Sequence, residues 1–431
     1  MRFLASEAAA AVGGRLDGAD VRIDGASFDS RSLRPGQLFV PIVAERDGHE
    51  FVPAALEAGA AAYLTARAPV GGTAIVVPDT LRALLDLGRW ARGRTPDRVV
   101  GITGSVGKTS VKDITAAVVS RRWRTAASER SFNNDQGLPV TILGAPDDVE
   151  VLVLEMGMRG FGEIARLCEV ARPTIGVVTS VAPAHTERVG GIEGIVRAKA
   201  ELVEALPANG IAILNADQPL VSGMRERTRA TVLTFGADSG DVRAVGVRLD
   251  RLARPSFSLV TPDGAVDVQL PLSGLHMVAN ACAAAAIGLA LDVALDVVAT
   301  GLESATLSPW RMEITEAPSG AIVINDTYNA NPESMRAALD ALVAVPADRR
   351  IAVLGVMAEI DDPELEHRGV AAYAAERNIH VIAVGTRLYG VEPIREADDL
   401  GLSVAGGDAI LVKGSRVAGL ERLAARLLSG G

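Results

Sequence analysis

The segment VVGITGSVGKTSV, residues 99–111, joins an apolar run to a glycine-rich turn and the start of a helix. The apolar residues predict a buried strand, and the helix is expected to begin at Lys108. Glycines let backbone N–H groups converge on anionic oxygens, and a helix N-terminus adds partial positive charge. Lysine can neutralise outer phosphates, and a threonine hydroxyl can hold Mg²⁺. The segment therefore predicts a phosphate-binding loop rather than an ordinary turn, made of Gly104, Ser105, Gly107, Lys108, Thr109 and Ser110.

The longer form of this loop would have a glycine at position 102, where the chain has Ile102. The match is therefore to a shorter GxxGKT pattern. Because the strand, the turn and the helix signal occur together, the pattern is more specific than an isolated glycine-rich turn.

Length, net charge and apolar content limit the kinds of protein that this chain can be. A length of 431 residues predicts two or three domains. The formal net charge of −10 argues against general binding to nucleic acid, and no apolar run reaches the ~18 residues of a membrane span. The first residues do not form a signal peptide, so a cytoplasmic location is expected. Cys168 and Cys282 lie in apolar, helix-like stretches, which favours buried free thiols over a disulfide or a zinc site.

Strand and helix signals alternate along three stretches, which predicts an α/β protein of three domains. Residues 1–96 read as a small α/β domain. Residues 97–309 read as a central phosphate-loop domain with a parallel sheet, and a small β-rich section covers about 241–272. Residues 310–431 read as a third unit, again with a parallel sheet.

Three polar side chains of the central region are candidates for a functional site. Glu155 ends a continuous apolar strand signal, where a carboxylate beside a phosphate loop can hold Mg²⁺; the alternative is a helix cap or surface glutamate. His185 follows a second such strand, although it could also be an ordinary loop histidine. Lys199 lies in a helical pattern, and composition alone makes it a solvated surface charge.

Polar clusters mark the expected substrate sites. Residues 131–139, SFNNDQGLP, read as a substrate loop or lid. The segments FDSR (28–31) and ERDGH (45–49) of the first domain lie at strand ends and could hold a ligand or form surface turns. In the last domain, NDTYNANP (325–332) and KGSR (413–416) both follow strand signals. A cleft between the last domain and the phosphate loop would explain these clusters.

These motifs together resemble the Mur ligase family. The resemblance covers essentially the whole chain and rests on DSR, PGQLFVPI, TGSVGKTS, SFNNDQGLP, LEMGMRGFGEI, PAHTE, RAKAE, SGLHMVANACAA, WRME, NDTYNANPESM and LVKGSR. Of its branches, the chain most resembles the one that joins D-Ala-D-Ala to UDP-N-acetylmuramoyl-tripeptide. The resemblance implies a UDP-substrate domain, a central ATPase and a C-terminal Rossmann-like domain. It also implies ATP and Mg²⁺ as cofactors and a monomer.

The resemblance also implies roles for single residues. Lys108 would act on the transferred phosphate, Thr109 and Glu155 would bind Mg²⁺, and His185 would serve a second Mg²⁺. Lys199 matches a lysine that is carbamylated in several relatives. Further implied contacts are Asn280 to adenine, Arg311 to phosphate, Asp326 to the ribose side of the cleft, and, to the substrates, Ser30, Arg31, His49, Asn133, Asn134, Tyr328, Asn329, Asn331, Lys413 and Arg416.

Two positions depart from the family pattern. Val356 replaces an acid in the sequence LGVM, and Asn325 replaces the first of two acids before the YNAN block. The alternatives are a related ligase that adds a single amino acid and a nucleotide-binding homologue without catalysis. The third residue of the peptide, diaminopimelate or lysine, is not readable from the sequence.

Overall fold

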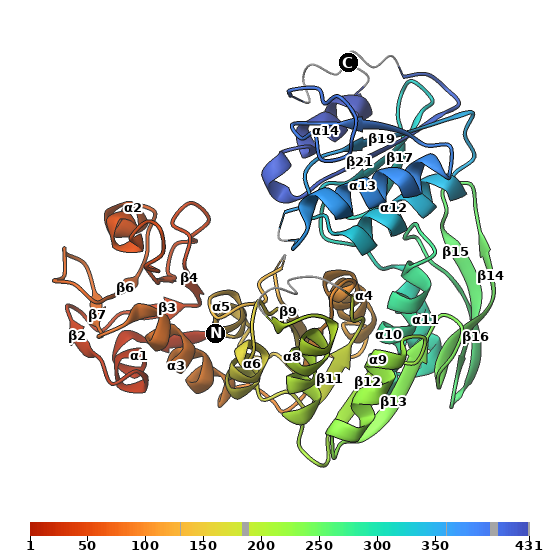
Figure 1. Ribbon diagram of the computed structural model, residues 1–431. Coiled ribbons are helices and arrows are strands. Elements are labelled where there is room, and N and C mark those ends of the chain that lie inside the picture. The colour runs from red at the N-terminus through yellow and green to blue at the C-terminus, as the bar shows by residue number, and fades with distance from the viewer. Residues whose placement is uncertain (130, 183–188, 359, 397–403, 430–431) are drawn as a thin grey trace.

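The computed structural model describes residues 1–129, 131–182, 189–358, 360–396 and 404–429. It contains three sheets of five, nine and five strands and a two-stranded ribbon, arranged as an α/β protein (Figure 1). The predicted fold class is confirmed. No helix in the described part of the chain is long and apolar enough to cross a membrane.

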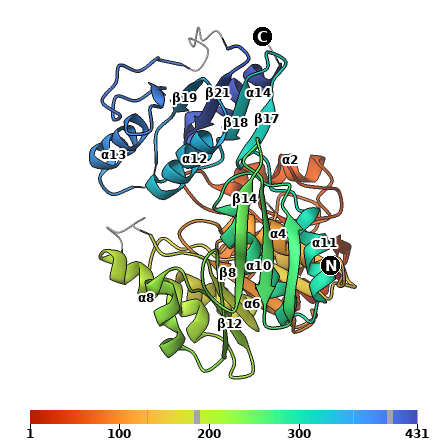
Figure 2. The ribbon, with the colours of Figure 1, turned by 90° about the vertical axis from the view of Figure 1, so that its right-hand side faces the viewer.

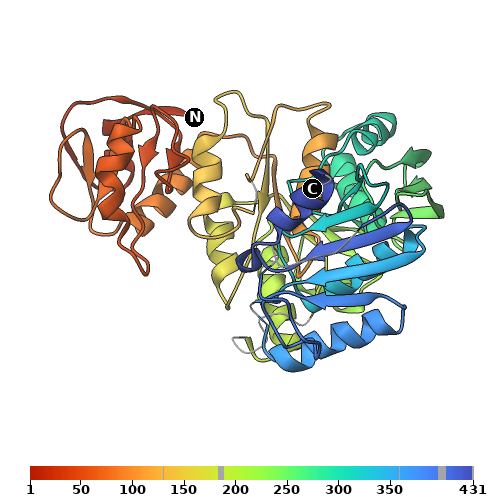
Figure 3. The same ribbon diagram turned by 90° about the horizontal axis from the view of Figure 1, so that it is seen from above.

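The N-terminal sheet has the strand order β2-β7-β6-β5-β4, parallel except where β2 meets β7. It lies to one side of the molecule when seen from above (Figure 3). Its elements are β1 (Arg2–Leu4), α1 (Ala5–Ala11), β2 (Arg15–Asp17), β3 (Arg22–Asp24), β4 (Ala26–Ser27), β5 (Leu38–Phe39), α2 (Val52–Glu57), β6 (Ala62–Thr65), β7 (Ala74–Val76) and α3 (Thr80–Arg92).

The central sheet has the order β16-β15-β14-β13-β12-β11-β8-β10-β9. Its strands are β8 (Val99–Thr103), β9 (Thr125–Ala127), β10 (Val151–Glu155), β11 (Ile175–Val178), β12 (Ile211–Asn215), β13 (Thr231–Gly236), β14 (Val242–Leu249), β15 (Pro255–Thr261) and β16 (Gly264–Gln269). Its helices are α4 (Lys108–Val119), α5 (Gly137–Gly144), α6 (Glu163–Ala171), α8 (Ile192–Glu204), α9 (Pro219–Ser222), α10 (Met277–Ala290) and α11 (Leu295–Glu303). The β-rich section is not separate, because β14, β15 and β16 extend the same sheet through a parallel β13–β14 pair.

Alternate side chains of the buried strands enter two different hydrophobic cores. On β8, Val100 and Ile102 pack in one core with α4 and α10, whereas Val99 joins a second core with α5 and α6. This alternation follows from the two-residue period of a strand. The second core also takes in Leu84 and Leu87 of α3, so the N-terminal and central domains share apolar packing.

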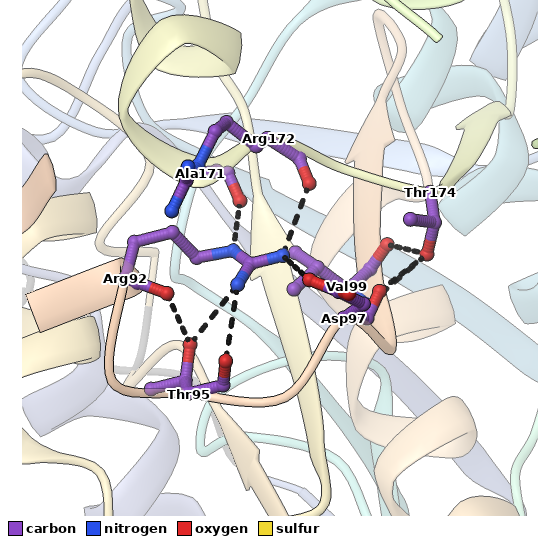
Figure 4. A network of polar contacts seen from close by, with 7 residues as sticks. All are labelled: Arg92, Thr95, Asp97, Val99, Ala171, Arg172 and Thr174. Carbon is purple, nitrogen blue, oxygen red and sulfur yellow. Dashed lines mark hydrogen bonds and ion pairs between the residues drawn. The ribbon is translucent and has the colours of Figure 1, made fainter. Parts of the chain in front are cut away.

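A buried arginine fixes the end of α3 to the central domain (Figure 4). The guanidinium of Arg92 is 2% exposed and donates to the backbone oxygens of Ala171, Arg172 and Thr95 and to the Asp97 carboxylate. The shortest of these bonds, to Ala171, is 2.6 Å. Because Ala171 and Arg172 end α6, the guanidinium satisfies carbonyls that the helix leaves free.

The C-terminal sheet has the order β17-β18-β21-β19-β20 and lies above the central domain in Figures 1 and 2. Its elements are β17 (Glu313–Glu316), β18 (Ile322–Asp326), α12 (Pro332–Ala344), β19 (Arg349–Leu354), α13 (Pro363–Ala375), β20 (His380–Ala383), β21 (Asp408–Lys413) and α14 (Glu421–Ser429). The expected parallel sheet is present, and β17 adds an antiparallel edge that the sequence pattern missed. The predicted loop over 131–139 is shorter than expected, since α5 already begins at Gly137.

The cysteines behave as the sequence predicts. Cys168 in α6 and Cys282 in α10 are both buried free thiols. Burial raises the pKa of Cys168 to about 12 and raises the pKa of Cys282 as well. Both side chains therefore stay protonated and act as small apolar groups.

Candidate active site

The predicted phosphate loop connects β8 to α4. Two of its glycines have left-handed backbone angles, with φ +153° at Gly104 and +85° at Gly107. A Cβ at Gly104 would lie 1.9 Å from the Thr179 hydroxyl oxygen, and one at Gly107 would lie 2.8 Å from Oδ1 of Asn280. Both positions therefore need glycine for conformation and for space.

Lys108, the first residue of α4, folds back over this loop. Its Nζ donates to the backbone oxygens of Gly104, at 2.6 Å, and Ser105, at 3.3 Å. Burial lowers the pKa of Lys108, although the Glu155 carboxylate opposes the shift. The ammonium therefore lies where an anion bound in the loop could replace these carbonyl partners.

Thr109 and Glu155 meet at the carboxyl end of the two central strands. The Thr109 hydroxyl donates to Oε2 of Glu155 at 2.7 Å, and Nδ2 of Asn133 donates to Oε1 at the same distance. The backbone N–H of Glu155 donates to the Ser128 hydroxyl. Glu155 is 1% exposed, so its carboxylate is buried but satisfied. A hydroxyl and a carboxylate are oxygen ligands of the kind that Mg²⁺ prefers.

An arginine from the start of the C-terminal region reaches the same place. Nη2 of Arg311 donates to the Thr109 hydroxyl at 3.0 Å. Its guanidinium lies over the ring of Tyr328, 4.1 Å from the centroid. The two residues that flank it, Trp310 and Met312, have φ of +65° and +47°. Left-handed angles at such residues are unfavourable, and this backbone holds Arg311 against the phosphate loop.

The polar cluster after β18 is partly used to hold the C-terminal domain together. Asp326 accepts hydrogen bonds from Nζ of Lys413 and from the backbone N–H of Met312. Lys413 also donates to the backbone oxygen of Asn329 at 2.9 Å, and Asn331 caps α12 by accepting from the Ser334 N–H. The parallel register places Asp326 opposite Lys413, which explains the ion pair.

A cavity of about 390 Å³ is lined by residues of the central and C-terminal domains. Its walls include the phosphate loop, the 133–136 segment and the turn before α12. Among its lining residues are the predicted Gly104, Ser105, Lys108, Asn133, Asn134, Lys199, Asn329 and Asn331. The cleft that the sequence predicts between the last domain and the phosphate loop is therefore present.

Lys199 lines this cavity from α8 and is 4% exposed, so the solvated surface charge that composition suggests is wrong. Burial lowers the pKa of Lys199 well below its usual value, and the positive charge of Lys108 lowers it further. Glu333 of α12 opposes this shift from the other domain. This lowered pKa increases the share of the neutral amine at a given pH.

Some predicted residues are not among those that line this cavity. Asn280 is on α10 beside Gly107, Ser110 is buried in the first turn of α4, and His185 lies outside the described residues. Arg416 lies over the Trp310 ring at 4.1 Å. His49 is buried; its Nδ1 bonds to Asp47 and its Nε2 accepts from the Ala66 N–H, so its ring holds a loop of the N-terminal domain.

A second cavity, of about 380 Å³, lies between the N-terminal and central domains. Asp29 lines it, whereas Arg31 is an exposed partner of that carboxylate and Ser30 is not among the lining residues. Residues that the sequence analysis did not single out individually include Phe28, Arg34, Gln37 and Phe132. Their position in or near the DSR motif and the 131–139 segment was the sequence feature that could have identified them.

Comparison with known proteins agrees with this arrangement. The profile of the Mur ligase middle domain matches residues 102–288, and that of the Mur ligase, glutamate ligase domain matches residues 310–423. The chain belongs to the Mur ligase family.

Within this family, the named relatives belong to one branch. The UDP-N-acetylmuramoyl-tripeptide--D-alanyl-D-alanine ligase of Mycobacterium tuberculosis is 39% identical, over 96% of this chain and 94% of that one. The crystal structure of MurF from Acinetobacter baumannii has a TM-score of 0.88, 30% identity and 99% coverage of both chains. MurF ligase from Thermotoga maritima in complex with ADP has a TM-score of 0.78 and 27% identity, over 94% of this chain and 97% of that one.

Proposed function

We propose that this protein is an ATP-dependent amide ligase that joins D-Ala-D-Ala to UDP-N-acetylmuramoyl-tripeptide, a step of peptidoglycan precursor synthesis. The observation that carries the proposal is the cavity where the phosphate loop, Lys199 and the Asn329–Asn331 turn meet. A ligase needs such a shared space because a phosphoryl donor, a carboxylate and an amine must come together there. The relatives named above support this choice of substrates.

The chemistry follows from the poor reactivity of a carboxylate. The terminal carboxylate of the peptide attacks the γ-phosphorus of ATP, and an acyl phosphate and ADP form. The amine of the dipeptide then attacks the activated carbonyl, and the tetrahedral intermediate collapses to the amide and phosphate. Lys108 and Arg311 lie where their positive charges would offset repulsion between the two anions and stabilise the transferred group.

We propose Mg²⁺ as the metal cofactor, held by the Thr109 hydroxyl and the Glu155 carboxylate, which already meet at 2.7 Å. Within the described residues, no three His, Cys, Asp or Glu side chains converge. This fits Mg²⁺, which takes one or two protein ligands and completes its coordination with phosphate and water. When bound, the ion would supply positive charge that offsets the negative charge of the nucleotide phosphates.

Following the family resemblance, His185 would serve a second Mg²⁺, and Lys199 would be carbamylated. The neutral Lys199 amine would attack the carbon of CO₂ and lose a proton, which converts the side chain into an anionic carbamate. The burial of Lys199 supports this reaction, since only the neutral amine is nucleophilic. The test is a ¹³C-carbonyl resonance after incubation with ¹³C-bicarbonate that disappears in Lys199→Ala.

The UDP end of the substrate is assigned to the cavity between the N-terminal and central domains. Arg34 provides a cation for a diphosphate, and Phe28 and Phe132 provide aromatic faces for a base or sugar. In this assignment Ser30 and Arg31 lie at the edge of the site, whereas His49 supports the domain without touching substrate.

We further propose the domain limits 1–96, 97–309 and 310–431, a monomeric state and a cytoplasmic location. The limits are supported by the element boundaries, since α3 ends at Arg92 before β8, and α11 ends at Glu303 before β17. The net charge of −10 supports the absence of nucleic-acid binding.

The test is phosphate release by the purified chain with ATP, Mg²⁺, UDP-N-acetylmuramoyl-tripeptide and a panel of acceptors. The expected result is release that needs both the nucleotide-sugar and D-Ala-D-Ala. Release with a single amino acid but not with the dipeptide would point to a related ligase. Absence of release with every acceptor would support a nucleotide-binding homologue without catalysis.

A further inference from the structure

Three consecutive residues of the central domain each contact a different part of the molecule. The Ser131 hydroxyl meets the Tyr328 hydroxyl of the C-terminal domain. The Phe132 ring packs on Phe28 of the N-terminal domain, with 5.3 Å between ring centroids. Asn133 donates to Glu155 at 2.7 Å. The segment 131–133 therefore touches both outer domains and the proposed metal ligand.

The backbone of this segment has little room to adjust. The N–H of Gly157, just after β10, donates to the backbone oxygen of Asn133 at 2.7 Å. A Cβ at Gly157 would lie 2.9 Å from Cγ of Asn133, and one at Gly137 would lie 2.6 Å from Cα of Phe132. Because both neighbours approach this closely, a displacement of Phe132 is passed on to Asn133 rather than absorbed between them.

The far contacts of the segment connect the two cavities. Phe28 and Phe132 both line the cavity assigned to the UDP end of the substrate, whereas Asn133 lines the cavity of the phosphate loop. Ser131 also contacts Tyr328, and the Arg311 guanidinium lies over the Tyr328 ring. Arg311 in turn donates a hydrogen bond to Thr109. A ligand in the first cavity is thus linked to Glu155 through two side chains, those of Phe132 and Asn133.

Resting on the proposed function, we propose that Phe132 is a positioning residue that couples the two sites. A nucleotide-sugar bound against Phe28 and Phe132 holds Asn133 on Glu155 and thereby strengthens binding of the Mg²⁺-nucleotide. By linkage, the Mg²⁺-nucleotide strengthens binding of the nucleotide-sugar by the same factor.

The test measures binding without turnover. Calorimetry gives the Kd of a non-hydrolysable ATP analogue with Mg²⁺, in the absence and in the presence of saturating UDP-N-acetylmuramoyl-tripeptide. For the wild-type chain we expect the Kd to fall by about fivefold or more, the usual size of a coupling between sites. Phe132→Leu keeps an apolar side chain but removes the ring. In this variant the ratio of the two Kd values, without and with the nucleotide-sugar, should fall to about one.

Phe51→Leu is the matched control, because Phe51 is a partly buried phenylalanine of the N-terminal domain that lines neither cavity. It should keep the wild-type ratio. If Phe132→Leu does not fold, Phe28→Leu tests the same path from the other side and should also lose the coupling. A purely structural role for Phe132 would lower Tm and leave the ratio unchanged, and this result would overturn the proposal.

Failure of this proposal is distinguishable from failure of the proposed function. Binding of both ligands by the wild-type chain with no change in Kd overturns the coupling alone and leaves the ligase assignment standing. Wild-type protein that binds the nucleotide but not UDP-N-acetylmuramoyl-tripeptide would overturn both.

Discussion

At the scale of single residues, the site contains lysines whose environments set their chemistry. Lys108 lies close enough to the buried Lys199 that its positive charge lowers the pKa of Lys199, whereas Lys413 forms an ion pair with Asp326. Two lysines lining one cavity are costly for folding, so their presence there indicates a functional requirement. Lys108 and Lys199 therefore each carry a prediction.

Lys108→Ala should reduce kcat for phosphate release by about 100-fold or more, the cost of removing one preorganised charge partner of a transition state. Gly104 and Ser105, whose backbone oxygens Nζ contacts, line the cavity, where water can replace the ammonium, so Tm should change little. Steady-state kinetics and a thermal melt check both statements. Arg124→Ala, which breaks an exposed ion pair with Asp148, is the control and should keep full activity.

Lys199→Met should raise the free energy of unfolding near pH 7, by about 0.5–2 kcal/mol, and abolish turnover. The folded-state pKa of Lys199 is lowered, so the unfolded chain binds a proton that the folded chain does not. The wild-type protein should therefore gain stability as pH rises toward the unfolded pKa near 10.5, and Lys199→Met should lose this part of the slope. Urea unfolding at several pH values measures the difference. An unchanged slope would contradict the burial argument.

At the scale of elements, a buried histidine of α13 holds the segment that follows β19. The segment after β19 lines the phosphate-loop cavity at Ala358, and Met357 in this segment donates its backbone N–H to Nε2 of His367 at 2.9 Å. His367 is fully buried in α13, and its Nδ1 bonds to the Pro363 oxygen. Because Nε2 accepts a hydrogen bond, the loop requires the neutral imidazole with its proton on Nδ1.

The His367 contact predicts an acid-sensitive loop. Burial lowers the pKa of His367 below 6.5, so the unfolded chain takes up the proton first as pH falls. This residue's contribution to stability is therefore present above pH 6.5 and is lost progressively below it. In His367→Gln, the amide can accept from Met357 and donate to Pro363. The free energy of unfolding, measured with denaturant, should therefore fall less between pH 7 and pH 5 than in the wild-type chain. An equally large fall in the variant would assign the acid sensitivity to other groups.

At the scale of the whole molecule, the two outer domains are attached differently. The N-terminal domain shares a hydrophobic core with α5 and α6, and Arg92 fixes the end of α3. The C-terminal domain also shares apolar packing, since Ile324 and Met335 belong to one hydrophobic core with α4 and α10. Its contacts beside the cavity are polar, because Arg311 donates to Thr109 and Tyr328 meets Ser131. Polar contacts are readily exchanged for contacts to a ligand, whereas apolar packing is not.

We therefore expect the C-terminal domain to close over bound ligands while the N-terminal domain keeps its place on the central one. Small-angle scattering should show a smaller radius of gyration with a Mg²⁺-ATP analogue and UDP-N-acetylmuramoyl-tripeptide together. A distance between spin labels on α2 and α6 should stay constant, and one between α6 and α13 should shorten. An unchanged radius with both ligands bound would contradict domain closure.

The sequence by itself determined the local features of this protein. The phosphate loop, the buried parallel strands, the α/β class and the free cysteines follow from glycine positions, periodicity and apolar runs, which act over a few residues. The tertiary structure alone decided which side chains meet. The contacts between Ser131 and Tyr328 and between Thr109 and Arg311 join residues 197 and 202 positions apart, and Lys199 becomes a cavity residue through burial between distant elements. Such contacts depend on how whole sheets pack, and no pattern within a short segment encodes that packing.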